Sequence, residues 1–157
     1  MAISMVEKVE DDIKTSLNAE TGFLQPNFTF YSLENDDDED ADLEFAVPNI
    51  IYGIEAVPID YFMDGSRIMS TDITFTVNIS EFNTISVSGD SLTRKRLINY
   101  ALDKLQKTLD DMTFSGVTDI EHSVRLGEAS GKVPIGEDEF LYRGTVTMSV
   151  TFTDSTT

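Results

Sequence analysis

Residues 90–112 read DSLTRKRLINYALDKLQKTLDDM, and this stretch decides how the rest of the chain is interpreted. Its apolar residues recur at steps of four and three: Ile98, Leu102, Leu105, Leu109 and Met112. This spacing places one apolar stripe on one face of an α-helix. Gly116 follows, where a helix is expected to stop. We therefore predict a helix over residues 90–112 that covers one face of a small sheet.

The charges of this predicted helix oppose its own dipole. Arg94, Lys95 and Arg96 lie near its start, whereas Asp110 and Asp111 lie near its end. A helix N-terminus carries partial positive charge, so each reversed charge costs roughly a few tenths of a kcal/mol. Two interpretations stay open: a solvated helix that tolerates this cost, or a basic cluster that meets an acidic partner.

Composition bounds the class of protein. The chain has 157 residues, 40% of them hydrophobic, which is enough to build the core of a single domain over residues 1–157. It contains no cysteine, so disulfides, thiolate chemistry and cysteine-ligated metals are excluded. The sequence contains no run of about 18 apolar residues, so we expect no membrane-spanning helix. The first residues lack the apolar centre of a signal peptide, so we expect none.

The chain is strongly acidic, with a formal net charge of −18 from 29 acidic and 11 basic side chains. Such a surface repels free nucleic acid. No Lys or Arg occurs between Lys14 and Arg67, and five of the 11 lie between Arg94 and Lys107. The acid excess suits a halophilic host, where salt screens the self-repulsion. An ordinary acidic protein in ordinary salt is the alternative.

Acidic residues concentrate in residues 34–44, ENDDDEDADLE, which we expect to form a solvated loop because like charges repel. Asp36, Asp38 and Asp40 match the first three ligand positions of an EF-hand. However, Ala41 and Val47 stand where that motif needs its Gly and its bidentate Glu. We therefore expect a solvated acidic loop and no EF-hand metal site, with adventitious binding of divalent cations as the open alternative.

The remaining elements follow from hydrophobic periodicity. Residues 3–20 predict a first helix that ends near Gly22. Strands are predicted at residues 28–33, 46–57, 71–80, 117–126 and 140–153. The clearest is TDITFTVNIS at 71–80, where Phe75 and its apolar neighbours alternate with polar residues. Pro58 ends the strand at 46–57 or marks a sheet edge.

The order of these elements shows no repeated βαβ rhythm. We therefore predict an α+β fold, a mostly antiparallel sheet with two helices packed on one face. The opposite face of the sheet is rich in Thr and Ser, and it meets either water or another copy of the same sheet. Residues 127–139, GEASGKVPIGEDE, predict a long hairpin loop. Long loops on small domains often carry function, so Gly127, Lys132, Pro134 and Gly136 are candidate contact residues.

Catalytic groups are sparse. The only histidine, His122, has no second His and no Cys to act with, so we interpret it as a packed residue. No Gly-x-Ser-x-Gly elbow, dinucleotide fingerprint or phosphate loop occurs. Carboxylate pairs arise by chance in so acidic a chain. We expect neither an enzyme nor a bound cofactor.

Several stretches resemble the tail terminator, or tail completion, proteins of long-tailed viruses. A helix such as residues 3–20 comes first, followed by a Pro-led strand such as VPNIIYGIEAVP and a strand such as TDITFTVNIS. The helix with ALDKLQKTLDD and a closing strand such as YRGTVTMSVTF complete the pattern. The acidic segment 34–44 departs from it. Related neck and tail-tube proteins share much of this architecture.

The resemblance implies a structural role in the virion. Such proteins form a hexameric ring that caps the tail tube, stops its growth and offers a surface to the neck or connector of the head. DNA passes through the bore without specific binding. The resemblance also implies assembly in the host cytoplasm and a final place at the head–tail junction, away from any membrane.

Two further hypotheses concern binding. In such a ring, the basic cluster Arg94, Lys95 and Arg96 of one subunit could meet Asp36, Asp37 and Asp38 of the next, and the loop at 127–139 could contact the tube or a neighbour. A different class also fits the charge: an acidic DNA mimic that occupies a DNA-binding enzyme. A mimic should space its carboxylates along an elongated face, whereas here they crowd into one loop.

Overall fold

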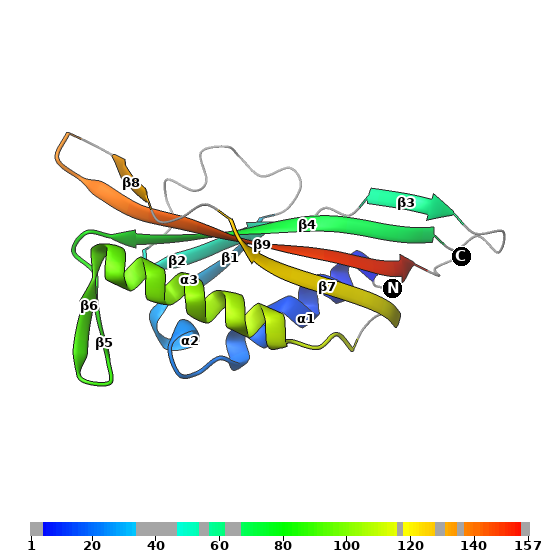
Figure 1. The fold of residues 1–157 in the computed structure, drawn as a ribbon, viewed down its shortest axis with the longest axis horizontal. Coiled ribbons are helices and arrows are strands. Elements are labelled where there is room, and N and C mark those ends of the chain that lie inside the picture. The colour runs from blue at the N-terminus through cyan, green and yellow to red at the C-terminus, as the bar shows by residue number, and fades with distance from the viewer. Residues whose placement is uncertain are drawn as a thin grey trace.

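A seven-stranded sheet forms the centre of the computed structural model, which describes residues 5–33, 47–53, 57–61, 67–115, 118–127, 131–134 and 137–154 (Figure 1). The strands of this sheet are β1 (Thr29–Leu33), β2 (Asn49–Gly53), β3 (Val57–Tyr61), β4 (Arg67–Ser80), β7 (Thr118–Leu126), β8 (Gly131–Pro134) and β9 (Phe140–Asp154). Their order is β1-β2-β4-β9-β7, with β3 beside β4 and β8 beside β9. Of the pairs described, β1 with β2 is parallel and the others are antiparallel.

Two long helices lie on one face of this sheet, as the sequence predicts, and the α+β fold is confirmed (Figure 1). They are α1 (Met5–Ala19) and α3 (Arg94–Asp111), and the short helix α2 (Leu24–Asn27) follows α1. The turn after α1 is held by Glu20, whose carboxylate accepts hydrogen bonds from the backbone N–H groups of Phe23 (3.0 Å) and Leu24 (2.5 Å). The same carboxylate lies 4.0 Å from the Lys104 ammonium group, which joins this turn to α3.

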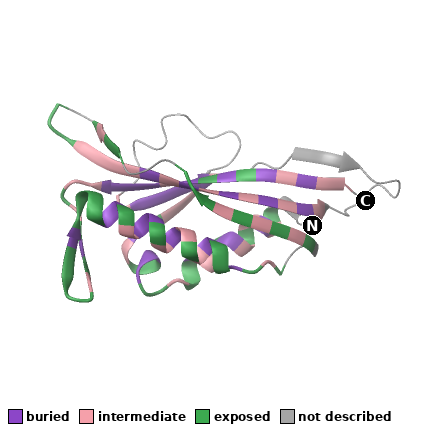
Figure 2. Cartoon of the chain, in the orientation of Figure 1, coloured by how far each residue is buried: buried purple, intermediate pink, exposed green. Residues whose placement is uncertain are grey.

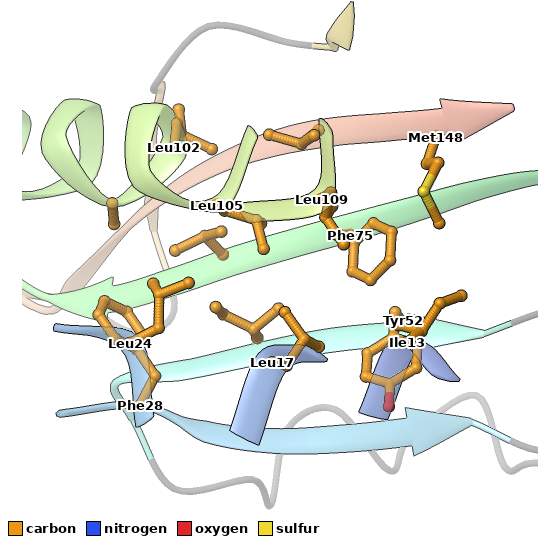
Figure 3. Close-up of a cluster of buried hydrophobic side chains, with 14 of the residues drawn as sticks. Ile13, Leu17, Leu24, Phe28, Tyr52, Phe75, Leu102, Leu105, Leu109 and Met148 are labelled. Atoms are coloured by element: carbon orange, nitrogen blue, oxygen red, sulfur yellow. The ribbon is translucent and has the colours of Figure 1, made fainter. Parts of the chain in front are cut away.

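The core fills the space between the helices and the sheet, as Figure 3 shows. From β4 it takes the alternating residues Ile73, Phe75, Val77 and Ile79, each with no exposed surface. The predicted stripe of α3 is buried too, and Met112 packs just beyond the end of the helix. Figure 2 shows the resulting alternation of buried and exposed residues along β4. Both predicted periodicities are therefore confirmed.

The start of the central helix was predicted wrongly. Residues 90–93 form strand β6 (Asp90–Thr93), which pairs with β5 (Thr84–Val87) in a separate two-stranded hairpin. Ser88 and Gly89 connect the two strands, and both have positive φ (51° and 88°), as a type I′ turn requires. Asp90 and Ser91 therefore begin the second strand of a hairpin rather than a helix.

The predicted loop at 127–139 contains a strand. Gly131–Pro134 form β8, which pairs with Phe140–Arg143 of β9, so β8 and β9 make a hairpin beyond the end of β7. A four-residue strand is too short to show a clear strand periodicity in the sequence. Its partner is the part of β9 that extends past β7. The predicted strand at 46–57 is also shorter, because β2 ends at Gly53 and Pro58 lies in β3 at an edge of the sheet.

The other face of the sheet carries hydroxyl groups. Opposite residues of β4 and β9 pair there as Thr74 with Thr147 and Thr76 with Thr145. No described helix lies on this face (Figure 1). The sheet is therefore covered by helices on one side and polar on the other, as the alternation of the sequence predicts.

Candidate functional site

The basic cluster lies at the exposed start of α3. Arg94, Lys95 and Arg96 are all exposed. No acidic residue lies in the first turn of the helix, and the Thr93 side chain makes no capping hydrogen bond. Arg94 has φ of 51°, a left-handed conformation that costs roughly 1–3 kcal/mol in a residue with a side chain. This helix start is therefore not optimised for stability, and it presents three cations to solvent.

An exposed aromatic residue lies in a turn next to the start of α3. Phe82 is 77% exposed, and it sits in the turn between β4 and β5. The hairpin register pairs Thr84 with Thr93, which brings this turn to the first residue of α3. We call Phe82, Arg94, Lys95 and Arg96 the aromatic–basic patch. Sequence reasoning missed Phe82, although an aromatic residue inside a polar turn was a visible signal.

The turn that carries Phe82 is held by three hydrogen bonds. The Phe82 N–H donates to the Ser80 hydroxyl (3.1 Å), and the Asn83 N–H donates to the Ser80 carbonyl (3.1 Å). The Ser80 N–H in turn donates to the Asn83 side-chain oxygen (2.6 Å). Phe82 is therefore presented to solvent from an ordered backbone.

A pocket of about 590 Å³ opens between α1 and β1. Its aromatic lining is Phe28, Phe30, Tyr31 and Tyr52, and its polar lining is Glu10, Lys14, Asn18, Gln25, Thr29 and Ser32. We call it the α1–β1 pocket. The Ser32 hydroxyl donates a hydrogen bond to the Glu10 carboxylate, which holds β1 against α1 across the pocket.

Two carboxylates, those of Glu10 and Asp11, act on Tyr52 in this pocket, and Lys14 is the basic residue of its lining. The pKa of Tyr52 is raised to about 12, first by burial and then by the charges of Glu10 and Asp11. Both effects disfavour the phenolate, because burial strips it of water and the carboxylates repel it. A ligand that combines an aromatic ring with positive charge suits such a pocket.

The candidate residues of segment 127–139 have separate surroundings. The Lys132 ammonium lies 3.9 Å from the centre of the Phe140 ring, a cation–π contact across the β8–β9 hairpin. Pro134 ends β8 and is exposed. Gly127 approaches β9 so closely that a Cβ atom would lie 2.2 Å from the Thr145 hydroxyl. Gly136 lies outside the described residues.

The proposed acidic partner of the basic cluster cannot be placed. Asp36, Asp37 and Asp38, with the whole of segment 34–44, lie outside the described residues. The hypothesis that the basic cluster meets the acidic segment stays a prediction.

His122 is a packed residue, as expected. Its Nε2 lies 3.1 Å from the Leu109 carbonyl and 3.3 Å from the Asp110 carbonyl, in the last turn of α3. Its ring also meets the Phe114 ring edge to face at 5.2 Å. The side chain thereby connects β7 to the end of α3, with backbone carbonyls as its partners.

Two chains of side-chain hydrogen bonds cross the polar face of the sheet. Arg143 Nε donates to the Asn78 oxygen (2.6 Å), and Asn78 Nδ2 donates to the Asn49 oxygen (2.9 Å). Further along, an Arg125 N–H donates to the Ser149 hydroxyl (2.9 Å), which donates to the Asp72 carboxylate (2.5 Å). These bonds tie β2, β4, β9 and β7 together through side chains.

Within the described residues, no group of three or more His, Asp or Glu side chains could hold a metal ion. None of the described helices is both long and apolar enough to cross a membrane. Comparison with models of protein families and with curated protein sequences gives no match.

Proposed function

We propose that this chain is a structural virion protein that forms a ring on the end of a viral tail tube, as tail terminators do. The proposal rests on the edges of the sheet: its strand order ends in two different strands, β1 and β7, and the short strands β3 and β8 also have one described neighbour each. Among the described strands, β1 has β2 as its one neighbour, and β7 has β9. Outer strands can pair with further strands. Two different outer surfaces on one subunit favour a head-to-tail contact, which closes into a ring when the rotation allows.

The polar face of the sheet supports the same proposal. Its central residues are hydroxyl-bearing, Asp72 and Arg125 are joined there through Ser149, and Arg143 donates to Asn78. A face of this kind suits water better than a packed interface. With a net charge of −18, the chain as a whole repels the phosphate backbone. DNA would therefore pass through the ring without specific binding.

The proposed partners follow from this role. The chain assembles with itself, as a hexamer in the proteins that it resembles, and the ring contacts the tail tube protein on one side and the neck or connector on the other. The exposed β8–β9 hairpin, with Lys132 and Pro134, is the proposed contact with the tube or with a neighbouring subunit. The role needs no catalysis, cofactor or membrane, and it places the chain at the head–tail junction after assembly in the host cytoplasm.

Tube growth tests the proposal. The tail tube protein of the same virus would be polymerised with increasing amounts of this chain, and tube lengths would be measured by electron microscopy. Capping predicts shorter tubes, each with a ring of this chain at one end. Incorporation along the whole tube would instead indicate another tail-tube component. A monomer that ignores tubes but inhibits a DNA-binding enzyme would indicate a DNA mimic.

A further inference from the structure

The aromatic–basic patch has the character of a docking surface. Large apolar side chains exposed on ordered backbone are uncommon, and Phe82 (77%) and Leu126 (50%) are those found among the described residues. Phe82 differs from Leu126 in that its turn lies next to the start of α3, which carries the exposed cations Arg94, Lys95 and Arg96. Glu81, which precedes Phe82, adds one negative charge against these three positive charges. An aromatic anchor next to arginines is the composition typical of a protein–protein hot spot.

The α1–β1 pocket has the complementary character. Its floor is aromatic, with Phe28 and Tyr52 almost fully buried, and its volume of about 590 Å³ is in the range of pockets that bind ligands. Phe30 and Tyr31, which are half-buried, offer ring surface to an incoming phenyl ring. Glu10 and Lys14 both line the pocket, and the exposed Asp11 of α1 lies near enough to act on Tyr52, so two carboxylates face one ammonium group here.

The two surfaces do not meet within one subunit. The pocket is lined by residues of α1, α2, β1 and β2, and Phe82 is not among them. Phe82 instead faces solvent at the end of β4 where α3 begins. We infer that the aromatic–basic patch of one subunit docks into the α1–β1 pocket of a second copy, with Phe82 in the pocket and Arg94, Lys95 and Arg96 facing the carboxylates of α1.

This inference rests on the ring proposed above and names the contact between its subunits. Patch and pocket are different surfaces, so the contact is head-to-tail and each subunit uses both of them. It also pairs the basic cluster with carboxylates of α1, which lie in the described part of the chain. The reversed charges at the start of α3 weaken the helix, but they would strengthen attraction to the carboxylates of the next subunit.

Photo-crosslinking identifies the occupant of the pocket. Phe82 is replaced by p-benzoylphenylalanine in the full chain, and the protein is mixed with isotope-labelled chain so that crosslinks between copies are recognised by mass. Crosslinks are expected on the labelled copy at the pocket residues of α1 and β1 or at Tyr52. Crosslinks confined to any other surface, or formed only with a different protein, would overturn the inference.

Substitutions test the energetics of the contact. Phe82→Ala should raise the dissociation constant between subunits by about 10-fold or more, as loss of an anchor side chain does. Leu126→Ala, the matched loss of the other exposed large apolar side chain, should leave it unchanged. Both sites are exposed, so both variants should melt like the parent. Equal assembly of the two variants would contradict the proposed role of Phe82.

A charge exchange tests orientation. Arg96→Glu alone and Asp11→Lys alone should each weaken assembly at low salt, and the chain that carries both should regain part of the loss. No recovery would contradict the pairing. If the parent chain assembles and caps tubes and these variants assemble equally well, the ring proposal is supported but this subunit contact is wrong. If the parent chain stays monomeric, alone and with tubes, both are wrong.

Discussion

At the scale of single residues, Gly144 sets the distance between the sheet and α3. It lies in β9 under the helix, where a Cβ atom would be 2.5 Å from Leu102 Cδ1 and within 3.2 Å of the rest of that side-chain end. Leu102 is itself buried in the core. Gly144→Ala should therefore lower the free energy of unfolding by about 1–3 kcal/mol through overpacking, measured by urea denaturation.

The control for this prediction is a double-mutant cycle with Leu102→Ala. Without the leucine side chain, the added methyl group has room, so Gly144→Ala should cost less in that background or even stabilise. If Gly144→Ala lowers the free energy of unfolding equally in the two backgrounds, the Leu102 side chain does not limit the approach of helix and sheet.

The raised pKa of Tyr52 predicts a loss of stability at alkaline pH. Its folded pKa of about 12 lies above the ordinary value of 10.0, so ionisation favours the unfolded chain. The neutral phenol therefore contributes fully below about pH 10, and this contribution falls as the pH rises from about 10 towards 12. The difference between these two pKa values corresponds to roughly 2–3 kcal/mol in the free energy of unfolding.

Urea midpoints at pH 9 and pH 11.5 measure this loss. The parent chain should lose more stability between the two pH values than Tyr52→Phe, which keeps the ring but has no proton to lose. Equal losses in both chains would mean that other groups, and not Tyr52, dominate alkaline unfolding.

At the scale of elements, the start of α3 trades helix stability for surface charge. Thr93 stands at the N-cap without a side-chain cap, and no first-turn acid follows. Arg96→Glu would place Glu three residues after Thr93, the spacing of a capping box, and would match the helix dipole. It should raise the stability of the monomer by about 0.5–1.5 kcal/mol, measured by thermal melting at a concentration too low for assembly.

Lys107→Glu is the matched control, because it makes the same change of charge nearer the C-terminal end of the same helix. There the dipole disfavours added negative charge, so this variant should be neutral or slightly destabilised. If both variants shift the melting temperature equally, net charge rather than the helix start explains the effect.

The phase of β4 is testable with two adjacent residues. Phe75 has no exposed surface and meets the Tyr52 ring at 5.1 Å between centroids, whereas Thr74 is exposed on the polar face. Phe75→Asp should unfold the domain, since an unpaired buried charge costs several kcal/mol. Thr74→Asp should melt within a few degrees of the parent. Circular dichroism distinguishes the two, and equal melts would mean that the strand is registered differently.

Local patterns predicted those elements whose signal lies in their own residues. The stripe of α3 and the alternation of β4 are repeated several times, so neighbouring positions agree. The hairpin β5–β6 was missed because Asp90 and Ser91 also resemble the start of a helix, and only pairing with β5 distinguishes the two. Strand β8 was missed because its partner, the first residues of β9, lies several residues further along the chain.

At the scale of the whole molecule, the sequence predicted part of the candidate site. Arg94, Lys95 and Arg96 stood out because their charge conflicts with the helix dipole, which is a local property. The α1–β1 pocket could not be predicted, because it forms where Glu10, Phe28 and Tyr52 meet from three distant segments. The fold brings a pocket to one part of the molecule and an exposed ring to another, and their match becomes visible only when both are placed.

The number of copies in the assembled particle tests head-to-tail docking most directly. Native mass spectrometry of the full chain at low ionic strength, over a range of concentrations, should show one dominant closed assembly, with six copies as in tail terminators. Phe82→Ala should shift the distribution towards the monomer. A monomer at every concentration would contradict docking, and so would a two-fold dimer that Phe82→Ala leaves intact, since there one surface meets its own copy.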